Sequence, residues 1–246
     1  MNNSFSLIIP AYKEEKFIEE TLRNFILACR KNSFDFELIT VIDNVIDDKT
    51  LEIVKKLSKD HSEIVIVSRE QKQGIASAIK DGINAAKKDV IIITVAGKHV
   101  NPSDIILMAK KMNENYDMVF GDRFTKGLRI SKYPKSKLIA NRLCNAVISI
   151  LFGINAKDIT SGVKAYKTPL LKNLKFNSIG FEIFVEIPVT VFLNGSSNFA
   201  VVPLTHHERD IMYSHFNLMT EWPRYFKTIV KLFLFKIKKY SSNIFD

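Results

Sequence analysis

Apolar residues alternate between continuous runs and helically spaced positions along the first hundred residues. The runs predict strands at 5–9, 36–42, 63–68 and 90–94. The spaced positions predict helices at 14–31, 48–59 and 75–87. Strands that are apolar on both faces and are joined by helices are typical of a parallel sheet covered on both sides. The pattern therefore predicts an α/β fold.

The second half continues with longer intervals between the elements. It predicts helices at 104–113, 136–152 and 182–193, and strands at 117–120, 159–166 and 199–203. In the first half, Pro10 is expected to end the first strand. Neither a repeat nor a low-complexity linker interrupts the pattern. We expect one domain over residues 1–216 and a basic helical tail over 217–246.

Composition narrows the class of protein. Apolar residues make up 46% of the chain and charged residues 25%, as in ordinary globular proteins. The two cysteines, Cys29 and Cys144, lie within apolar helical patterns and predict buried thiols. With neither a secretory signal nor an apolar stretch of about 18 residues, the sequence predicts a cytoplasmic protein.

The formal net charge of +10 favours anionic partners such as nucleotide phosphates or acidic lipid. Nucleic acid is disfavoured, because the chain lacks interleaved aromatic and basic motifs. Ligand sites of parallel α/β sheets gather at the carboxyl ends of the strands. Here those ends are residues 10–15, 43–48, 68–74 and 95–99.

Seven motifs, in a fixed order from about Ser6 to Phe216, resemble the family 2 glycosyltransferases, and the dolichyl-phosphate mannose synthase branch in particular. They are Ile9-Pro10-Ala11-Tyr12-Lys13-Glu14-Glu15, Val41-Ile42-Asp43-Asn44, Gln73-Gly74-Ile75-Ala76-Ser77-Ala78, Gly121-Asp122-Arg123, Thr160-Ser161-Gly162-Val163-Lys164-Ala165-Tyr166, Gly180-Phe181-Glu182 with Glu186, and Val202-Pro203-Leu204 followed by Arg209 and Ser214. The resemblance implies a GT-A-type nucleotide-diphosphosugar transferase fold, with a mostly parallel central sheet and helices on both faces.

The resemblance also implies a nucleotide-binding set: Pro10, Ala11, Tyr12, Glu14, Asp43, Asn44, Gly74, Ala96 and Gly97. A carboxylate at a strand end, such as that of Asp43, can accept a hydrogen bond from a base N–H. Helix capping and first-turn charge are the competing interpretation of Asp43 and Glu14.

Arg123 and Arg209 stand where the family places cations that face phosphates, and a guanidinium binds phosphate through paired hydrogen bonds. Lys135, Ser161 and Gly162 are the implied acceptor-binding residues. A polyprenyl phosphate oxygen would attack the anomeric carbon directly, in one inverting step. A sugar hydroxyl as acceptor would instead need a carboxylate base, for which Asp158 and Glu182 are the candidates.

The chain departs from the family where the fourth strand ends. The family's Asp-x-Asp pair, which holds Mg²⁺ or Mn²⁺, is replaced by Val95 and Gly97. Since hard divalent cations prefer several oxygen ligands, we expect no conventional metal site. Lys98 and His99, with Arg123 and Arg209, could supply fixed positive charge instead. A donor of lower charge, or a catalytically silent protein that binds a nucleotide or a partner, would also explain the loss.

Residues 222–240 predict an amphipathic helix, with Lys227, Lys231 and Lys238 near one face and aromatic and aliphatic residues over much of the rest. Such a helix suits a membrane interface, although packing on the domain or on a second subunit would give the same pattern. The sequence thus predicts a glycosyltransferase that moves a sugar from a nucleotide-sugar donor to a polyprenyl-phosphate acceptor, peripheral on the cytoplasmic face of the membrane, without the usual metal cofactor and with oligomerisation open.

Overall fold

The computed structural model of the chain describes residues 4–44, 48–71, 74–94, 101–125, 135–205 and 218–242. Its strands are β1 (Ser4–Ala11), β2 (Asp35–Asp43), β3 (Ile64–Arg69), β4 (Val90–Ile93), β5 (Met118–Asp122), β6 (Lys164–Lys167) and β7 (Phe199–Pro203). Its helices are α1 (Ile18–Lys31), α2 (Thr50–Asp60), α3 (Gly74–Ala85), α4 (Pro102–Met112), α5 (Lys135–Phe152), α6 (Thr168–Lys172), α7 (Ile183–Leu193) and α8 (Leu218–Ser242).

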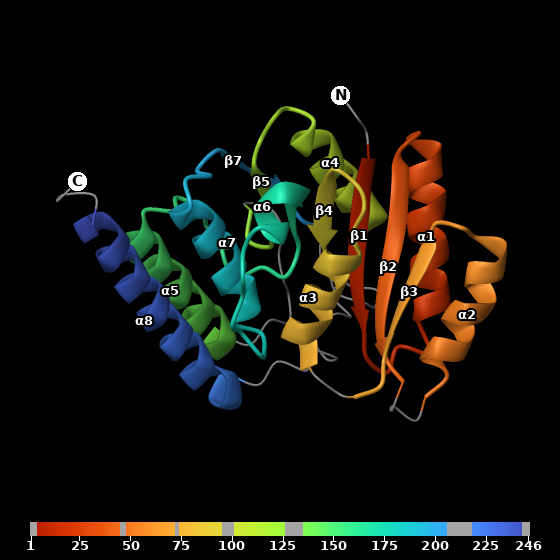
Figure 1. Cartoon of the computed structure of the whole chain (residues 1–246), viewed down its shortest axis with the longest axis horizontal. Coiled ribbons are helices and arrows are strands. Elements are labelled where there is room, and N and C mark those ends of the chain that lie inside the picture. The colour runs from red at the N-terminus through yellow and green to blue at the C-terminus, as the bar shows by residue number, and fades with distance from the viewer. Residues whose placement is uncertain are drawn as a thin grey trace.

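The strands form a single sheet in the order β3-β2-β1-β4-β6-β5-β7 (Figure 1). β1, β2, β3 and β4 are mutually parallel, and β5 pairs with β7 in the same sense. β6 lies antiparallel between β4 and β5. The prediction of a mostly parallel α/β sheet is confirmed.

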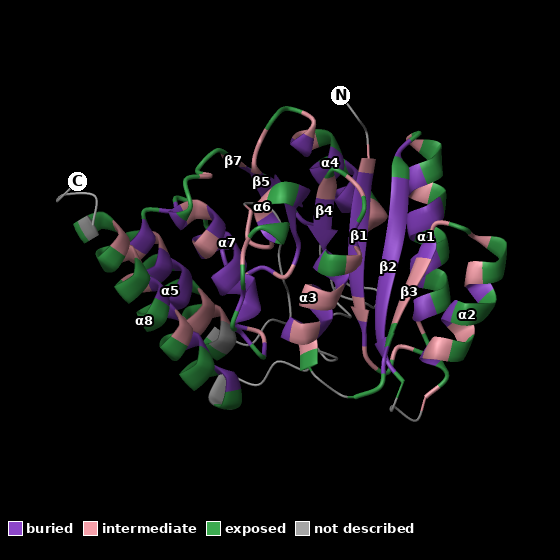
Figure 2. Cartoon of the chain, in the orientation of Figure 1, coloured by how far each residue is buried: buried purple, intermediate pink, exposed green. Residues whose placement is uncertain are grey.

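Helices cover both faces of the sheet, so that the strands lie in the buried interior (Figure 2). Alternate residues of β1 face opposite sides: Ile8 packs in the core of α3, α5, α6, α7 and α8, whereas Leu7 and Ile9 pack in the core of α1, α2 and α4. Because both faces are apolar, the strands read as continuous hydrophobic runs. The parallel direction of β1, β2, β3 and β4 places their carboxyl ends at the same edge of the sheet.

Most element boundaries differ from the sequence prediction by one or two residues, and three of the differences have a clear structural reason. β1 continues through Pro10 to Ala11, because β4 pairs with β1 only as far as Ile8 and Pro10 lies beyond that ladder. The first helix begins at Ile18 instead of residue 14, because a turn closes over Glu14, whose carbonyl oxygen accepts from the N–H groups of Phe17 and Ile18. The strand predicted at 159–166 begins only at Lys164, since residues 157–160 form a turn.

The long C-terminal helix α8 packs against α5 and α7. Three of its residues, Tyr225, Ile229 and Leu232, are buried in the core formed with α3, α5, α6 and α7. The sequence pattern did not predict the short helix α6. The division into a domain at 1–216 and a tail at 217–246 stays a prediction. Among the described helices, none combines the length and apolar character needed to cross a bilayer.

Candidate functional site

The carboxyl ends of β1, β2, β3 and β4 lie at one edge of the sheet, at the bottom of Figure 1. This edge brings together Pro10, Ala11, Asp43, Asn44 and the start of α3 at Gly74. Tyr12 and Glu14 follow β1 in the turn that precedes α1. The predicted residues Ala96, Gly97, Lys98, His99 and Arg209 lie outside the described residues.

A buried ion pair lies at this edge, between the ends of β2 and β3. The Asp43 carboxylate pairs with the guanidinium of Arg69, and the two side chains are only 5% and 8% exposed. Arg69 also donates to the carbonyl oxygen of Gly74 at 3.4 Å and lies 3.6 Å from the Asp81 carboxylate. Arg69 therefore joins the ends of β2 and β3 to the start of α3, which fixes the direction of the Asp43 carboxylate. A lone arginine at the end of an apolar strand was the signal for it in the sequence.

A pocket of about 310 Å³ lies between the end of β2 and α2. It is lined by Ile42, Asp43, Asn44, Asp48, Leu51, Glu52 and Lys55. Its volume is at the lower end of the range for small-molecule sites. Two predicted nucleotide-binding residues, Asp43 and Asn44, border it, and none of the predicted residues of the β1 segment does.

Glu14 lies near a second acidic residue, Asp48. Its backbone N–H donates to the Thr50 hydroxyl at 3.0 Å, and that hydroxyl donates to Asp48 at 2.6 Å. Burial, and then the charge of Asp48, raise the pKa of Glu14 to about 7. Near neutral pH, Glu14 is therefore present in both protonation states.

Replacing Glu14 with glutamine is expected to remove a pH dependence of stability. Because folding raises this pKa from 4.5 to about 7, the folded state binds the proton more tightly, and stability falls as pH rises through this window. Relative to E14Q, the parent protein should lose on the order of 1 kcal/mol of unfolding free energy between pH 4.5 and 7, after allowance for solvent screening. Urea unfolding across pH 4–8 measures it.

The Asp48→Asn variant is the matched comparison for this prediction. It removes the second cause of the shift and should move the loss of stability to lower pH. A difference between parent and E14Q that stays constant from pH 4 to 8 would contradict the assignment.

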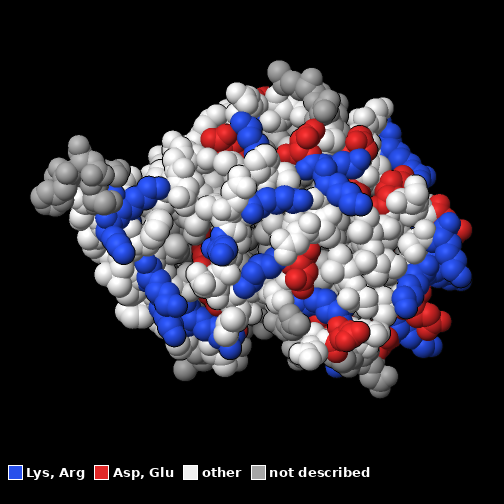
Figure 3. All heavy atoms as spheres, in the orientation of Figure 1, with Lys and Arg blue, Asp and Glu red and all other residues white. Residues whose placement is uncertain are grey.

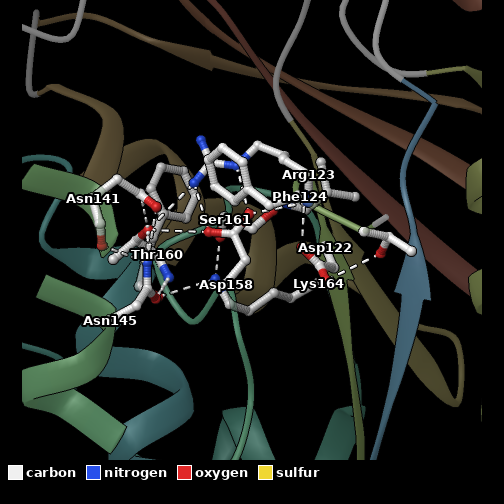
Figure 4. Close-up of polar contacts among 12 residues, drawn as sticks. Asp122, Arg123, Phe124, Asn141, Asn145, Asp158, Thr160, Ser161 and Lys164 are labelled. Atoms are coloured by element: carbon white, nitrogen blue, oxygen red, sulfur yellow. Dashed lines mark hydrogen bonds and ion pairs between the residues drawn. The ribbon is translucent and has the colours of Figure 1, made fainter. Parts of the chain in front are cut away.

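A second cluster follows β5 and surrounds Asp158 (Figure 4). Arg123 binds this carboxylate with two side-chain bonds of 2.7 Å and donates its backbone N–H at 3.1 Å. Burial alone would raise the pKa of Asp158, but the charge and hydrogen bonds of Arg123 hold it below its ordinary value. A fully buried carboxylate with both oxygens engaged is poorly suited to act as a base, so this geometry argues against that role for Asp158. The Arg123 side chain itself is 21% exposed.

Two asparagines of α5 extend the cluster. The Thr160 hydroxyl accepts from Asn141 at 2.7 Å and from Asn145 at 3.2 Å, and the Thr160 N–H donates to Asn145 at 3.2 Å. Their spacing of four residues on an apolar helix was the available sequence signal. Ser161, predicted to bind the acceptor, is fully buried, and its hydroxyl accepts from the N–H of Val163 at 3.3 Å.

Lys164 holds the loop that contains Ser161. Its ammonium group donates to the carbonyl oxygen of Ser161 and, at 3.1 Å, to that of Phe184. Burial, with a further contribution from the charge of Arg123, lowers its pKa to about 7 against the opposing effect of Asp158. The lysine thereby ties the predicted acceptor loop to the first turn of α7.

Glu182 and Glu186 shape the loop before α7. Glu182 accepts the N–H groups of Ile179 and Gly180 at 2.9 and 3.1 Å, and Glu186 accepts those of Asn177 and Ser178, each at 2.8 Å. Four consecutive backbone donors are thus satisfied by two buried carboxylates. This accounts structurally for the spacing of the two glutamates in the sequence.

The predicted residues fall into two groups around the carboxyl edge of the sheet. Pro10, Ala11, Asp43, Asn44 and Gly74 gather at the ends of β1 and β2 and at the start of α3. Arg123, Asp158 and Ser161 gather beyond β5 (Figure 4), and Gly162 follows Ser161 in the chain. Lys135 begins α5, and its side chain lies outside the described part of the chain. The sequence prediction missed Arg69, Asn141, Asn145 and Lys164.

Comparison with protein families gives a match over most of the chain. The sequence model described as "Glycosyl transferase family 2" matches residues 6–175. This range includes most of β1, all of β2 to β6 and both clusters of the candidate site, but neither α7 nor α8.

Among curated proteins, the chain is 26% identical over 189 residues to a dolichol-phosphate mannosyltransferase of Pyrococcus furiosus, covering 74% of this chain and 51% of that protein. It is 31% identical over 233 residues to an uncharacterized protein of Methanocaldococcus jannaschii, covering 92% and 90%. It is 26% identical to an undecaprenyl-phosphate 4-deoxy-4-formamido-L-arabinose transferase of Edwardsiella ictaluri, covering 87% and 63%. The chain thus spans about half to two thirds of those two relatives with a named activity.

Among solved structures, the chain is similar to the glucosyl-3-phosphoglycerate synthase of Mycobacterium tuberculosis, determined with Mn²⁺, UDP-glucose and phosphoglyceric acid. The TM-score is 0.65 at 20% identity, and the match covers 95% of this chain and 79% of that one. At this identity the likeness concerns the fold, which confirms the predicted GT-A type.

Proposed function

The chain belongs to glycosyl transferase family 2, and we propose that it transfers a sugar from a nucleotide-sugar donor to a polyprenyl-phosphate acceptor with inversion at the anomeric carbon. The observation that carries the proposal is the family match over residues 6–175, together with relatives whose names include dolichol-phosphate and undecaprenyl-phosphate transferases. The Asp43–Arg69 pair supports the nucleotide half of it, because it presents a fixed carboxylate at the edge where α/β sheets bind ligands.

The acceptor half follows from the chemistry of a phosphate nucleophile. A phosphate oxygen of the acceptor forms a bond to the anomeric carbon while the bond from that carbon to the donor diphosphate breaks, and the nucleoside diphosphate departs. Such a nucleophile is already ionised near neutral pH, so no strong base is required from the protein. This agrees with Asp158 being fully engaged by Arg123.

The family's divalent cation does not fit the residues of this chain at the end of β4. Val95 and Gly97 offer no side-chain oxygen. Cations of the chain can meet the leaving diphosphate instead, with Arg123, Arg209, Lys98 and His99 as the candidates. Of these, Arg123 is described, and its side chain is 21% exposed while it holds Asp158.

Thermal-shift measurements with UDP, GDP, CDP and their sugar conjugates, in EDTA and in Mn²⁺, test this proposal. We expect stabilisation by at least one nucleotide of about 2.7 kcal/mol at a concentration 100-fold above its Kd, and the same shift in EDTA. Sugar transfer to a polyprenyl phosphate is then assayed with the nucleotide that binds. Stabilisation that needs Mn²⁺ would overturn the metal-free proposal, and nucleotide binding without turnover would favour a catalytically silent protein.

We further propose that α8 places the protein on an anionic membrane surface. Trp222, Phe226, Val230, Leu234 and Ile237 are all exposed, between 39% and 62%, and recur at helical spacing along one arc of α8. Exposed lysines, Lys227, Lys231 and Lys238, stand beside this arc, and basic side chains run along α8 in Figure 3. An apolar arc flanked by lysines fits the boundary of acyl chains and anionic headgroups.

A neighbouring helix adds to the apolar surface. On α5, Ile139, Leu143, Val147 and Ile150 are exposed at spacings of four, four and three residues, with Ile150 at 82%. α5 packs beside α8. Two adjacent helices thus each carry an exposed apolar row, and exposed apolar patches rimmed by polar residues commonly mark membrane or protein interaction sites.

Phe226→Glu and Leu234→Glu are expected to weaken co-sedimentation with phosphatidylglycerol vesicles by at least about ten-fold each, because each loses the transfer of a large apolar side chain. Substitutions are preferable to truncation of α8, whose buried residues belong to the core. Leu27→Glu, at a residue 66% exposed on α1, is the matched control and should bind as the parent does. Equal vesicle binding by all variants, or a parent that dimerises through this face without binding vesicles, would contradict the proposal.

A further inference from the structure

The loop before α7 carries polar groups that its own fold does not use. Glu182 satisfies two loop N–H groups through Oε1, which leaves its Oε2 directed elsewhere. The side chain is only 3% exposed, and no donor among the described residues reaches Oε2. The buried hydroxyl oxygen of Ser178, on the same loop, likewise has no hydrogen-bond partner there.

The first turn of α8 supplies a matching group. Glu221 is 8% exposed, and its Oε1 accepts from Arg224 at 3.2 Å. Its Oε2 also lacks a donor within the described part of the chain. The start of a helix favours a negative charge, but this does not supply the hydrogen bond that a buried carboxylate oxygen needs.

These groups converge over Gly180. A Cβ built on this residue would lie 2.8 Å from Glu182 Oε2, 2.9 Å from Glu221 Oε2 and 3.0 Å from Arg224 Nη1. Three polar atoms, one from the loop and two from α8, thus lie close around Gly180, where no side chain larger than glycine's would fit. Two of the three atoms are buried acceptors without a donor.

The chemistry of the three groups selects a ligand. A divalent cation would need more oxygen ligands and would be repelled by the guanidinium of Arg224. The described residues contain no group of three side chains suited to a metal. A phosphate would face two carboxylates. A hydroxyl group donates to a carboxylate and accepts from a guanidinium at once, and two neighbouring hydroxyls can satisfy both carboxylates.

We propose that Glu182, Glu221 and Arg224 form a subsite for paired ring hydroxyls of a sugar, so that α8 contributes directly to substrate recognition. The subsite lies between the two halves of the candidate site. The Ile179 carbonyl oxygen is 3.1 Å from the Cβ position of Gly74 at the start of α3, and Lys164 joins the first turn of α7 to the Ser161 loop. The assignment to the donor's sugar rests on the proposed function, because a polyprenyl phosphate has no ring hydroxyls, whereas a sugar acceptor would bring its own.

The test compares Glu221→Gln with the parent protein in two arms. In the first, calorimetry gives the Kd of UDP, UDP-glucose, GDP and GDP-mannose. In the second, methyl α-D-glucoside and methyl α-D-mannoside are titrated with and without nucleotide and followed by saturation-transfer NMR. We expect E221Q to lose about ten-fold in affinity for the sugar-bearing ligand, the size of one hydrogen bond to a charged group, and to leave UDP or GDP unchanged.

The arms separate the sources of the hydroxyls. Loss in the first arm identifies the donor's sugar, and loss confined to the second identifies a sugar acceptor. Glu114→Gln, at a side chain 54% exposed near the end of α4, is the matched control. Glu182→Gln is a second variant of the subsite and is measured in the same two arms. Circular dichroism then checks that the protein, including the loop before α7 that Glu182 holds, stays folded.

If the parent binds no nucleotide, the proposed function fails while the glycoside arm still tests the subsite. If neither the sugar-dependent part of nucleotide-sugar affinity nor glycoside binding changes in E221Q, the subsite is overturned.

Discussion

Replacing Arg123 with leucine is expected to lower the free energy of unfolding by about 3 kcal/mol, because it leaves the buried Asp158 carboxylate without its counter-charge. Arg123 supplies three hydrogen bonds to that carboxylate, which is 0% exposed, and its side chain provides two of them. Chemical denaturation at pH 7 measures the loss. The double variant with Asp158→Leu should recover part of it, since no unpaired charge then remains.

The pH dependence of the stability provides a second test of this prediction. Arg123 lowers the pKa of Asp158 in the folded protein, so the stability that it contributes is present above the unfolded pKa and is lost as pH falls through the folded one. The gap between parent and R123L should therefore narrow below pH 4. Arg142→Leu is the matched control, because Arg142 lies 4.4 Å from the centre of the Phe124 ring and its loss should cost less than about 1 kcal/mol. Equal destabilisation by both changes would refute the buried-pair interpretation.

Replacing Arg69 with methionine should cost about 3 kcal/mol of stability and also weaken nucleotide binding. The guanidinium is buried against Asp43 and bonded to the Gly74 carbonyl oxygen, so its loss leaves a buried carboxylate unpaired and frees the start of α3. If Asp43 accepts a base N–H, the milder Asp43→Asn should raise the nucleotide Kd by about ten-fold or more, the value of a hydrogen bond to a charged acceptor. Isothermal titration with the nucleotide found by thermal shift measures the Kd for both variants. Urea unfolding measures the stability lost in Arg69→Met.

Arg30→Met is the control for this pair. Arg30 also pairs with a carboxylate, that of Glu63, but the Arg30 side chain is 51% exposed, and exposed pairs contribute less than about 1 kcal/mol. Unchanged nucleotide affinity in Asp43→Asn would exclude Asp43 from base recognition, even if Arg69→Met proved destabilising.

The positions of the buried strands could be read from the sequence because two-sided burial leaves a direct mark. Phe5, Leu38 and Ile92 belong to runs whose residues all face helices, one side or the other, and such runs need no tertiary information to be recognised. The family motifs could be read as well, since their order along the chain is a property of the sequence. The roles of Ala96, Gly97, Lys98, His99 and Arg209 stay predictions.

The sequence was less informative wherever a polar residue acts through a distant partner. Asp158 has the residue type of a general base, yet Arg123, 35 positions earlier, occupies its oxygens. The strand expected at 159–166 begins late because the chain first turns to present Asp158 and Thr160 to that arginine and to α5. Pair distances of this kind depend on the packing of whole elements, and no local pattern encodes them.

The C-terminal helix shows the same division most clearly. The apolar and basic faces of α8 follow from the 3.6-residue period and were visible in the sequence alone. That Tyr225, Ile229 and Leu232 enter the core, and that Glu221 and Arg224 meet Glu182 over Gly180, was decided only by tertiary structure. By itself the sequence determined the strand and helix pattern, the family motifs and the loss of the Asp-x-Asp pair, because these are local or ordered along the chain. The tertiary structure decided which charges are paired and which buried oxygens are left without a donor among the described residues, because both depend on atoms brought together from segments far apart in the sequence.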